Sequence, residues 1–508
     1  MIEVIATLLR WSQLASNMIL VGSCVFLAIA GSFNTPWVDR MTRLLPWLAG
    51  ILLLGLMGIL VTTTAQATGV DENAWRPDAW LGLVQNTRMG HIWAARTVCA
   101  LIVLGVVLYI RYAPAARWRY VLCATAAALT LAVGSLASHS AADEFSVTAI
   151  LPYTLHIILA SVWFGALPAF LLVVLTVIRQ PAPTEAAHAG TPSGSVQRMA
   201  TQFQPEETLQ SGVLALKRFS LMAMPVMLAI VATGVIITDR MVDTSYAALV
   251  STQYGWLLNA KLALLALVLM IAARARSTWL PLFAQGQDLA AAGAQSLRKW
   301  VRIEFVLALA IVLLATIVAN TVPAKHALIQ IWPYSFRFSI DATWGDESVM
   351  VRAWSGLALL VLAGGAIVSG RLRHWSKMRR IGIPLVLLIA AMAAALPPLA
   401  IDAYPETYRK TPVPFDTISI ANGAALFAED CVACHGPQGK GNGILAKTFA
   451  KPPVDMLTEP HTAKHTAGDF FHWLTYGIPD TGMPEFADKL AEEDRWDVVN
   501  YLHAMSRG

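Results

Sequence analysis

The residues with the most specific chemistry are Cys431, Cys434 and His435, which stand as Cys-Val-Ala-Cys-His near the C-terminus. Two cysteines separated by two residues and followed at once by histidine are typical of a covalent haem attachment site. The two thiols add to the vinyl groups of the haem, and the histidine is placed to ligate the iron on one face. Because haem is attached to such motifs outside the cytoplasm, we expect this segment to face the periplasm or its equivalent.

Three helical patterns surround this motif and must position it. Ala421–Phe427 leads into the motif, Ala467–Tyr476 forms a middle helix, and Glu492–Met505 forms an amphipathic terminal helix. Trp496 and Val499 lie on one apolar face of the terminal helix. The sequence therefore predicts a small helical haem domain at the end of the chain.

Residues 416–508 resemble a class I cytochrome c. The matching motifs are Cys431-Val-Ala-Cys434-His435-Gly436, Gly439-Lys-Gly441-Asn-Gly443 and Gly482-Met483-Pro484. The resemblance implies one covalent haem c, with His435 as the proximal iron ligand and Met483 as the sixth ligand. Two other methionines lie in this segment: we assign Met505 to helix packing, and Met456 lies in a loop nearer the motif.

This ligand set predicts the kind of chemistry that the domain performs. A thioether in place of a second imidazole raises the reduction potential, which suits an acceptor of respiratory electrons. An iron with both axial positions filled has no open position for a substrate, so we expect single-electron transfer and no bond chemistry. The chain is therefore expected to be an electron-transfer or transport protein rather than an enzyme.

The composition of the whole chain is typical of a membrane protein with many spans. Of its 508 residues, 56% are hydrophobic and only 14% are charged. The net charge of +5 does not indicate nucleic-acid binding, because the basic residues lie in short loops between apolar runs. Of the five cysteines, Cys24, Cys99 and Cys123 lie inside apolar runs, where we interpret them as small core residues.

We expect an all-α protein, a helical membrane bundle of about ten transmembrane helices followed by the cytochrome c-like domain. Ten apolar runs are long enough to cross a bilayer. They lie near residues 11–31, 44–64, 91–110, 120–138, 150–178, 218–238, 256–273, 301–321, 352–370 and 381–400. With ten spans, the basic loops all fall on one side and both termini fall on the other. The first run has no convincing cleavage site, so we expect it to be retained as a membrane helix.

These runs divide the chain into four predicted parts: an eight-helix membrane domain (1–325), an outer loop with two further helices (326–403), a proline-stiffened tether (404–415) and the cytochrome c domain (416–508). The inner loop near 180–212 is rich in Pro, Ala, Gly, Thr and Ser and predicts a flexible connector. The outer segment 329–344 alternates aromatic and polar residues. It is interpreted either as an interfacial aromatic belt or as a shelf for the C-terminal domain.

The first eight spans resemble the copper-resistance protein D (CopD) family. The matching pieces are Gly90-His91-Ile-Trp93-Ala-Ala-Arg96, Ser138-His139-Ser-Ala-Ala, Leu155-His156 through Trp163-Phe-Gly165, Arg218-Phe219-Ser220, Tyr254-Gly255-Trp256 with Lys261, and Arg302-Ile-Glu304. The family is associated with copper uptake across the inner membrane and with copper tolerance. The resemblance implies the same here: a multi-pass protein of the bacterial inner membrane, with the haem domain in the periplasm.

His91, His139 and His156 are the candidate metal ligands of the membrane domain. All three are expected near the outer ends of consecutive spans, and three neutral imidazoles suit copper. Two alternatives stay open: structural hydrogen bonds at helix ends, and an axial role for a haem b. A haem b near the inner face lacks ligands, because only His188 and His374 lie there.

Three ionisable residues within the spans each need a reason, since charge is costly in hydrocarbon. One interpretation is that Arg96 and Lys261 snorkel toward the outer interface. The other is that they hold an anion or a haem propionate, or repel free cations. Glu304 is expected to be neutralised by Arg302 or Lys299.

We therefore predict a membrane-bound c-type cytochrome fused to a copper-handling permease. Its expected partners are a periplasmic or membrane electron donor or acceptor, a copper ion or periplasmic copper-binding protein, and the lipid bilayer. Two alternatives remain: an electron-transfer protein that carries haem b as well as haem c, and a membrane-anchored cytochrome c that serves a respiratory oxidase.

The ten-span topology makes a testable prediction. A reporter that is active only in the cytoplasm should work when fused near residue 190 and should be inactive when fused after Gly508, because these sites fall on opposite sides of the membrane. The reverse pattern of reporter activity would contradict both the ten spans and the external haem domain.

Overall fold

A computed structural model describes residues 2–30, 33, 35–114, 116–138, 146–178, 205–242, 246–283, 287–456 and 465–506. The chain divides into two compact units, Met1–His326 and Ala327–Gly508. The predicted connector near 180–212 lies outside the described residues except for its last part, which is already helical because α9 begins at Pro205.

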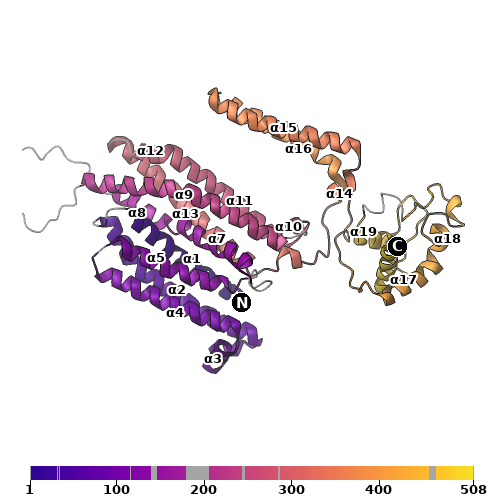
Figure 1. Cartoon of the computed structure of the whole chain (residues 1–508), viewed down its shortest axis with the longest axis horizontal. Coiled ribbons are helices and arrows are strands. Elements are labelled where there is room, and N and C mark those ends of the chain that lie inside the picture. The colour runs from indigo at the N-terminus through magenta and orange to yellow at the C-terminus, as the bar shows by residue number, and fades with distance from the viewer. Residues whose placement is uncertain are drawn as a thin grey trace, which may run out of the picture. The chain divides into compact units, whose positions relative to one another are not determined.

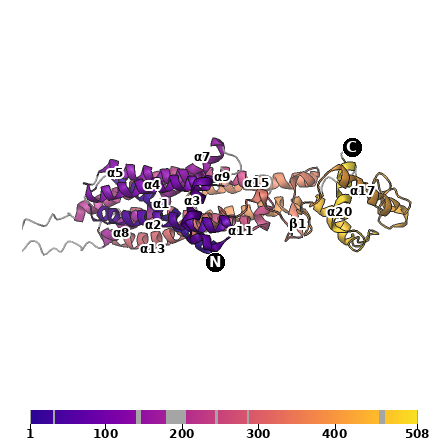
Figure 2. The same cartoon turned by 90° about the horizontal axis from the view of Figure 1, so that it is seen from below.

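The first unit is a bundle of long helices (Figure 1). Its elements are α1 (Ile2–Ala30), α2 (Pro36–Thr68), η1 (Asp71–Trp75), α3 (Pro77–Asn86), α4 (Arg88–Tyr112), α5 (Arg117–Ser135), α7 (Val147–Phe164), α8 (Leu167–Ile178), α9 (Pro205–Val242), α10 (Ala248–Ser251), α11 (Gln253–Arg274), the π-helical turn η3 (Ala275–Trp279), α12 (Leu280–Phe283), α13 (Gln287–Val318) and η4 (Ala324–His326). The long helices run side by side (Figure 2). The end of α8 and the start of α9 lie at the opposite end of the bundle from α3 and α10.

Ten helices in the described part of the chain are long and apolar enough to cross a membrane, eight in the first unit and two in the second. This confirms the expected fold class and identifies the chain as a multi-pass membrane protein. The first helix begins at Ile2, nine residues earlier than the apolar run alone predicts. The polar residues of that first stretch are compatible with a helix, so the hydropathy pattern did not reveal them.

Helix α1 is the most buried of the ten candidate spans. Leu20, Phe26 and Leu27 are fully buried, and α2, α5, α7, α9 and α13 all pack against this helix. A helix that is buried all round belongs to the centre of a bundle. The helices α2, α5, α7, α8, α9 and α13 therefore surround α1.

The fifth predicted span is broken into α7 and α8 at Gly165 and Ala166. A Cβ atom at Gly165 would lie 1.9 Å from the Met18 carbonyl oxygen, and one at Gly22 would lie 2.3 Å from the Ser161 carbonyl oxygen. Only glycine allows the backbones of α1 and α7 to approach this closely. The hydroxyl of Ser23 donates to the Gly165 carbonyl oxygen at 2.7 Å, which satisfies one backbone group at the break.

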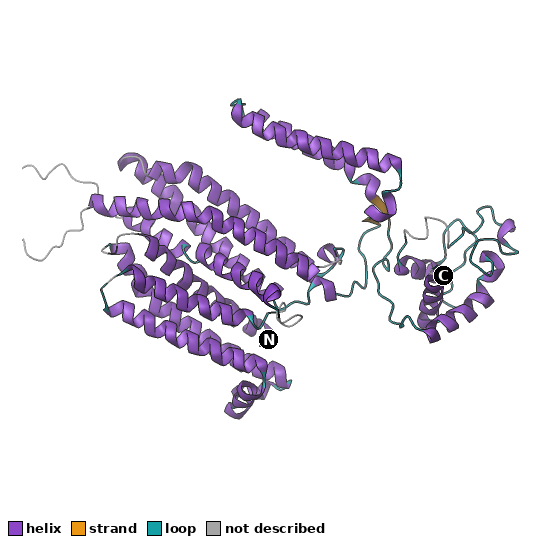
Figure 3. Ribbon diagram, viewed as in Figure 1, coloured by secondary structure: helices purple, strands orange, loops and turns teal. Residues whose placement is uncertain are grey.

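The second unit contains two long helices, a small two-stranded ribbon and the C-terminal helices (Figure 3). Its elements are β1 (Phe336–Phe338), α14 (Ile340–Thr343), α15 (Glu347–Leu372), α16 (Lys377–Ala395), η5 (Pro397–Leu399), β2 (Ala400–Asp402), α17 (Thr417–Asp430), α18 (Val432–His435), η6 (Ala446–Thr448), α19 (Ala467–Tyr476) and α20 (Glu492–Met505). The strands pair antiparallel, with Phe336 opposite Asp402. The ribbon therefore closes the α15–α16 hairpin, since β1 precedes the hairpin and β2 follows it.

The ribbon packs directly on the C-terminal helical domain, at what we call the ribbon junction: Trp332, Arg337, Tyr404, Thr407 and Asp469. The Trp332 backbone N–H donates to the Pro405 carbonyl oxygen at 2.7 Å, and the Tyr404 ring stacks on His472 with centroids 4.2 Å apart. Thr407, in the predicted tether, is only 1% exposed. The first residues of that segment are thus packed against α19 rather than freely solvated. These contacts favour the shelf interpretation of residues 329–344.

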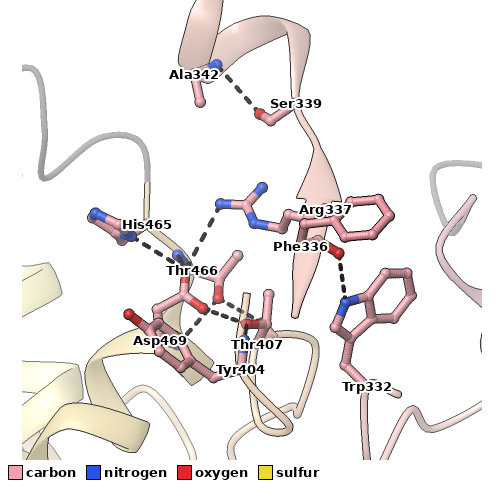
Figure 4. Close-up of polar contacts among 10 residues, drawn as sticks. All are labelled: Trp332, Phe336, Arg337, Ser339, Ala342, Tyr404, Thr407, His465, Thr466 and Asp469. Carbon is pink, nitrogen blue, oxygen red and sulfur yellow. Dashed lines mark hydrogen bonds and ion pairs between the residues drawn. The ribbon is translucent and has the colours of Figure 1, made fainter. Parts of the chain in front are cut away.

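A buried carboxylate holds the ribbon junction together (Figure 4). Asp469 is fully buried; it accepts hydrogen bonds from the Thr407 hydroxyl at 2.5 Å and the Thr466 backbone N–H at 2.9 Å. Arg337 of β1, itself 8% exposed, places a guanidinium nitrogen 3.7 Å from the same carboxylate, and His465 lies 3.4 Å away. Gly468 lets α19 approach the segment around Glu406 closely, since a Cβ atom at this position would lie 1.8 Å from the Glu406 carbonyl oxygen.

This environment lowers the pKa of Asp469. Burial alone would raise the pKa, but the interactions with His465 and Thr407, the Thr466 N–H and the charge of Arg337 favour the carboxylate more strongly. A carboxyl group whose pKa is lower in the folded state stabilises the fold above its unfolded pKa, near 3.8. That contribution is lost as the pH falls through this value toward the folded pKa.

Arg337→Met tests the ribbon junction. Removal of the cation leaves a buried carboxylate without its counter-charge, so the free energy of unfolding of the second unit should fall by about 3 kcal/mol at neutral pH. The acid-unfolding midpoint should also rise, because the pKa of Asp469 increases. Both are measured by denaturant and acid titration of the full protein.

Lys410→Met is the matched control, because it removes one exposed positive charge from the same part of the chain. If both variants unfold at the same denaturant concentration and pH, the ion pair contributes nothing to the junction.

Candidate haem site and polar groups of the membrane domain

The haem motif lies at the end of α17, where the chain turns sharply. Asp416 caps the start of this helix by accepting hydrogen bonds from the backbone N–H groups of Ile418 and Ser419. Cys431 is the C-cap residue, and the short helix α18 carries Cys434 and His435. One rigid helix and one tight turn thus hold both thiols and the imidazole together.

Burial sets the protonation states of these groups. Burial, together with the charge of Asp430, raises the pKa of Cys431 to about 12, so this residue is a neutral thiol rather than a thiolate. Burial also lowers the pKa of His435, which favours the neutral imidazole that can ligate a metal. The His435 Nδ1 atom is buried and has no hydrogen-bond partner.

A glycine-rich loop folds back on the motif directly after His435. Gly436 has a φ of 75°, and a Cβ atom there would lie 2.1 Å from the Asn442 side-chain oxygen. The Gly441 N–H donates to the His435 carbonyl oxygen at 2.8 Å, and the Gly443 N–H donates to that of Cys434 at 3.2 Å. This loop fixes the backbone on one side of the site.

Met483 lies in a separate hydrogen-bonded turn between α19 and α20. Its backbone N–H donates to the Thr481 hydroxyl oxygen at 3.2 Å, and its carbonyl oxygen accepts from the Ile478 N–H at 3.3 Å. The half-buried side chain packs against the core around Phe471. The ring of Phe449 covers the preceding glycine, where a Cβ atom would lie 2.0 Å from the ring.

The two other methionines of this domain have different positions. Met456 and Met505 both bring their methyl groups to Gly439, where a Cβ atom would lie 3.3 Å and 3.4 Å from them. Gly439 belongs to the loop that follows His435, so both thioethers pack on the proximal loop. Met483 is the methionine that does not pack on this loop, and it would therefore be available as the sixth ligand.

Helices α17 and α20 cross closely beneath the site. A Cβ atom at Gly423 would lie 2.1 Å from the Asp497 carbonyl oxygen. The Asp497 carboxylate accepts from the Ser419 hydroxyl at 2.5 Å, while Trp496 stacks on Phe471 at 4.2 Å. The terminal helix is therefore buried on a polar face as well as on its predicted apolar face. A hydrophobicity pattern cannot show the polar face, because its residues are buried through hydrogen bonds.

This set of donors fits a haem c. Two neighbouring thiols match covalent attachment, a neutral imidazole matches the proximal ligand, and a thioether on another segment matches the sixth ligand. When bound, the haem supplies one-electron Fe(III)/Fe(II) chemistry. Cys431 and Cys434 would hold the group, the glycine-rich loop would orient the His435 imidazole, and the surrounding apolar side chains would exclude water.

The candidate metal-binding histidines that the structure describes lie in different surroundings. His91 is exposed near the start of α4, with Nε2 3.1 Å from the Gln85 carbonyl oxygen. His156 is half-buried, roughly 13 Å along α7, against roughly 5 Å along α4 for His91. His139 lies outside the described residues. The two histidines that the structure describes thus lie at different distances from the starts of their helices, because His156 is nine residues into α7.

His156 is oriented as metal-ligating histidines usually are. Its Nδ1 atom lies 3.1 Å from the Ile230 carbonyl oxygen and 3.0 Å from the Thr233 hydroxyl oxygen. Since the Thr233 hydroxyl donates to backbone carbonyls of its own helix, this network assigns the hydrogen to Nδ1. Nε2 then presents its lone pair. A backbone carbonyl that fixes the tautomer is the usual support of a metal-bound imidazole.

Arg96 points into the bundle rather than toward the interface. Its guanidinium donates to the Gln13 side-chain oxygen of α1 at 2.7 Å. Among the described residues it has no carboxylate partner, and the buried amide of Asn17, one turn from Gln13, has no hydrogen-bond partner at all. The inward contact contradicts snorkelling and leaves an uncompensated cation beside buried polar groups.

Lys261 and Glu304 complete the set of ionisable groups. Lys261 has no hydrogen bond or ion pair within the described chain. Glu304 is 5% exposed and forms no ion pair with Arg302 or Lys299 among the described residues, so the expected neutralisation is wrong. Both basic residues lie near Glu304 in sequence, but a separation of two or five residues places side chains on different faces of a helix.

Three family models match the chain. They are "Copper resistance protein D-like, N-terminal domain" over residues 1–149, "Copper resistance protein D" over residues 213–318 and "Cytochrome c" over residues 420–506. The matches cover both resemblances noted in the sequence.

Curated relatives match the C-terminal domain. A cytochrome c6 of Synechococcus elongatus is 31% identical over 84 residues, which are 16% of this chain and 86% of that protein. A cytochrome c6 of Cladophora glomerata is 32% identical over 91 residues, 17% of this chain and 90% of that protein. Among solved structures, a "reducing HAO-like protein complex" of Kuenenia stuttgartiensis matches 26% of this chain and 61% of that chain, at 24% identity and a TM-score of 0.17. That last likeness does not bear on the fold.

The fold and the haem site together define a multi-pass membrane protein with a c-type cytochrome domain. The chain belongs to the copper-resistance protein D family through its membrane domain and to the cytochrome c family through its C-terminal domain. It is a fusion of the two.

Met483→Ala tests the sixth ligand. Haem should remain covalently attached, because both thiols are intact, but the long-wavelength sulfur-to-iron absorption band should disappear. The reduction potential should fall by on the order of 0.1 V or more, within the range of about 0.8 V that axial ligands span. Met456→Ala is the matched control and should keep the band. A Met483→Ala protein with an unchanged band would show that another residue ligates the iron.

Proposed function

We propose that this protein carries single electrons on the periplasmic side of the bacterial inner membrane and couples them to copper handling by its membrane domain. The residues proposed to hold the single haem c are Cys431, Cys434, His435 and Met483. Its electron partners would be a periplasmic or membrane donor and acceptor. Its copper partner would be the ion itself or a periplasmic copper-binding protein.

The observation that carries this proposal is the presence of both family domains in one chain. Copper changes between Cu(II) and Cu(I), which prefer different ligands: imidazole suits either, whereas thiolate and thioether select Cu(I). Uptake that starts from one oxidation state and ends in the other needs a one-electron carrier. A six-coordinate haem in the same chain is such a carrier.

The proposed copper ligands in the outer half of the membrane domain are His139 and His156, with His91 as a weaker third member. His156 is the best-supported of these ligands, because its Nδ1 contact with the Ile230 carbonyl leaves Nε2 with a free lone pair. His139 and His156 belong to consecutive spans, and such neighbours are usually adjacent. A haem b axial role for His156 is the alternative for the same lone pair.

A second candidate function is supported by the ribbon junction. The described contacts that hold the haem domain involve residues 332–337 and 404–409, outside both matched copper-resistance segments. The α15–α16 hairpin would then anchor a cytochrome c for a respiratory oxidase, with no copper transport. The haem domain would carry electrons in both cases.

Metal and haem analysis of the purified protein distinguishes these functions. Copper handling predicts that copper co-purifies with the wild type and that its amount falls in the His139→Ala, His156→Ala double variant, while the haem content and spectrum stay unchanged. A pyridine haemochrome assay should report c-type haem alone. His374→Asn is the control, because asparagine tolerates the φ of 50° at this position in the turn between α15 and α16.

Equal copper in all three proteins would remove the copper role of these histidines, whereas absence of copper from all three would leave the anchored cytochrome. A b-type haem signal that disappears in the double variant would instead identify His139 and His156 as haem ligands.

A further inference from the structure

Two cysteines that the sequence assigns to separate apolar runs meet inside the membrane domain. Cys24 of α1 and Cys123 of α5 are both fully buried and interact side chain to side chain. They are 99 residues apart in the chain, so no sequence motif connects them. Cys99, the third thiol outside the haem motif, lies on α4 and is partly exposed.

The positions of the two cysteines in their helices agree with this contact. The chain reverses its direction three times between α1 and α5, so these packed neighbours are antiparallel. Cys24 is six residues before the end of α1, and Cys123 is six residues after the start of α5. Both thiols therefore lie roughly 9 Å from the same end of the bundle. By the predicted topology this is the inner end.

The residues around the two thiols limit which metal ions the pair could bind. Both residues belong to the main apolar core, and the nearby Tyr120 hydroxyl is already engaged with the Thr42 hydroxyl at 3.0 Å. Within the described chain no third histidine, cysteine or carboxylate joins them to complete a larger ligand group. Zinc requires four ligands, and an iron–sulfur cluster requires four thiolates. A soft cation that accepts only two sulfur ligands remains.

We propose that Cys24 and Cys123 form a two-sulfur site for Cu(I) in the inner half of the membrane domain. Thiolate ligands select Cu(I) over harder ions, and Cu(I) is stable with two ligands. As the two Cu–S bonds form, a thiol proton is released and no electron is transferred, so no oxidant or reductant is needed. Loss of one proton gives a neutral complex, the form that a low-dielectric environment favours.

This site would add an inner copper site to the outer site proposed above. The outer half would offer imidazole, which accepts either oxidation state, and the inner half would offer thiols, which hold only Cu(I). The choice of copper rests on the proposed function, whereas the meeting of the two thiols does not.

Anaerobic competition with a chromophoric Cu(I) chelator tests the site in the full-length, haem-loaded protein. Wild type and Cys99→Ser should each retain a tight Cu(I) site, and Cys24→Ser and Cys123→Ser should each bind Cu(I) at that site at least about tenfold more weakly. Serine is nearly isosteric with cysteine, and an unchanged haem spectrum and elution volume will show that each variant is folded.

X-ray absorption of the wild type tests the site without relying on any variant. With one equivalent of Cu(I), X-ray absorption at the copper edge should show two sulfur neighbours and no nitrogen. Nitrogen ligation, or equal Cu(I) affinity in all three serine variants, would overturn this site and leave the proposed copper function standing. Absence of any Cu(I) binding by the wild type would overturn both. A thiol count that shows Cys24 and Cys123 joined as a disulfide in the purified protein would overturn the site alone.

Discussion

The hydrocarbon core of a bilayer contains no water, so every polar group placed there must find a partner within the protein. This constraint explains why the described membrane-spanning segments are helices, whose backbone groups bond within one segment. It also explains the close crossing of α1 and α7, where Gly22 and Gly165 let the backbones meet and Ser23 satisfies a carbonyl at the break. The few polar side chains that lie deep in the bundle are costly, and each one points to a role.

Three of those polar and soft side chains lie on the central helix α1. Gln13 and Asn17 lie one turn apart on the face of α1 that meets Arg96, and Cys24 lies further along the same helix. Because α1 is surrounded by the other helices, its polar groups are shielded from lipid and line the interior of the domain. A membrane protein that moves a charged species needs such groups in its interior and excludes them from its lipid-facing surface.

The haem domain obeys a different constraint, because it folds in water and depends on its own small core. Trp496 and Phe471 stack at its centre, and buried hydrogen bonds between α17 and α20 supplement this apolar contact. The ribbon junction then fastens the domain to the α15–α16 hairpin through a carboxylate that water does not reach. A domain held in this way keeps a constant distance from the hairpin, whereas a freely solvated tether would let it diffuse.

The sequence by itself determined the features that depend on local chemistry or on hydrophobic length. The Cys-Val-Ala-Cys-His motif, the ten spans, the two family resemblances and the bounds of α19 and α20 were all readable, because each depends on residues close together in the chain. Hydropathy also predicted the all-helical class. The fifth span was predicted as one uninterrupted run, since the break at Gly165 depends on the approach of α1 and not on local propensity.

Only the tertiary structure decided which distant residues meet. Arg96 contacts Gln13 across 83 residues, and Arg337 contacts Asp469 between β1 and α19. Cys24 and Cys123 are each an ordinary buried cysteine in the sequence, yet helix packing brings them together. A hydrophobic pattern shows that a residue is buried but not what it is buried against. Which residues contact one another depends on how whole helices cross. The sequence of a single helix does not determine that crossing.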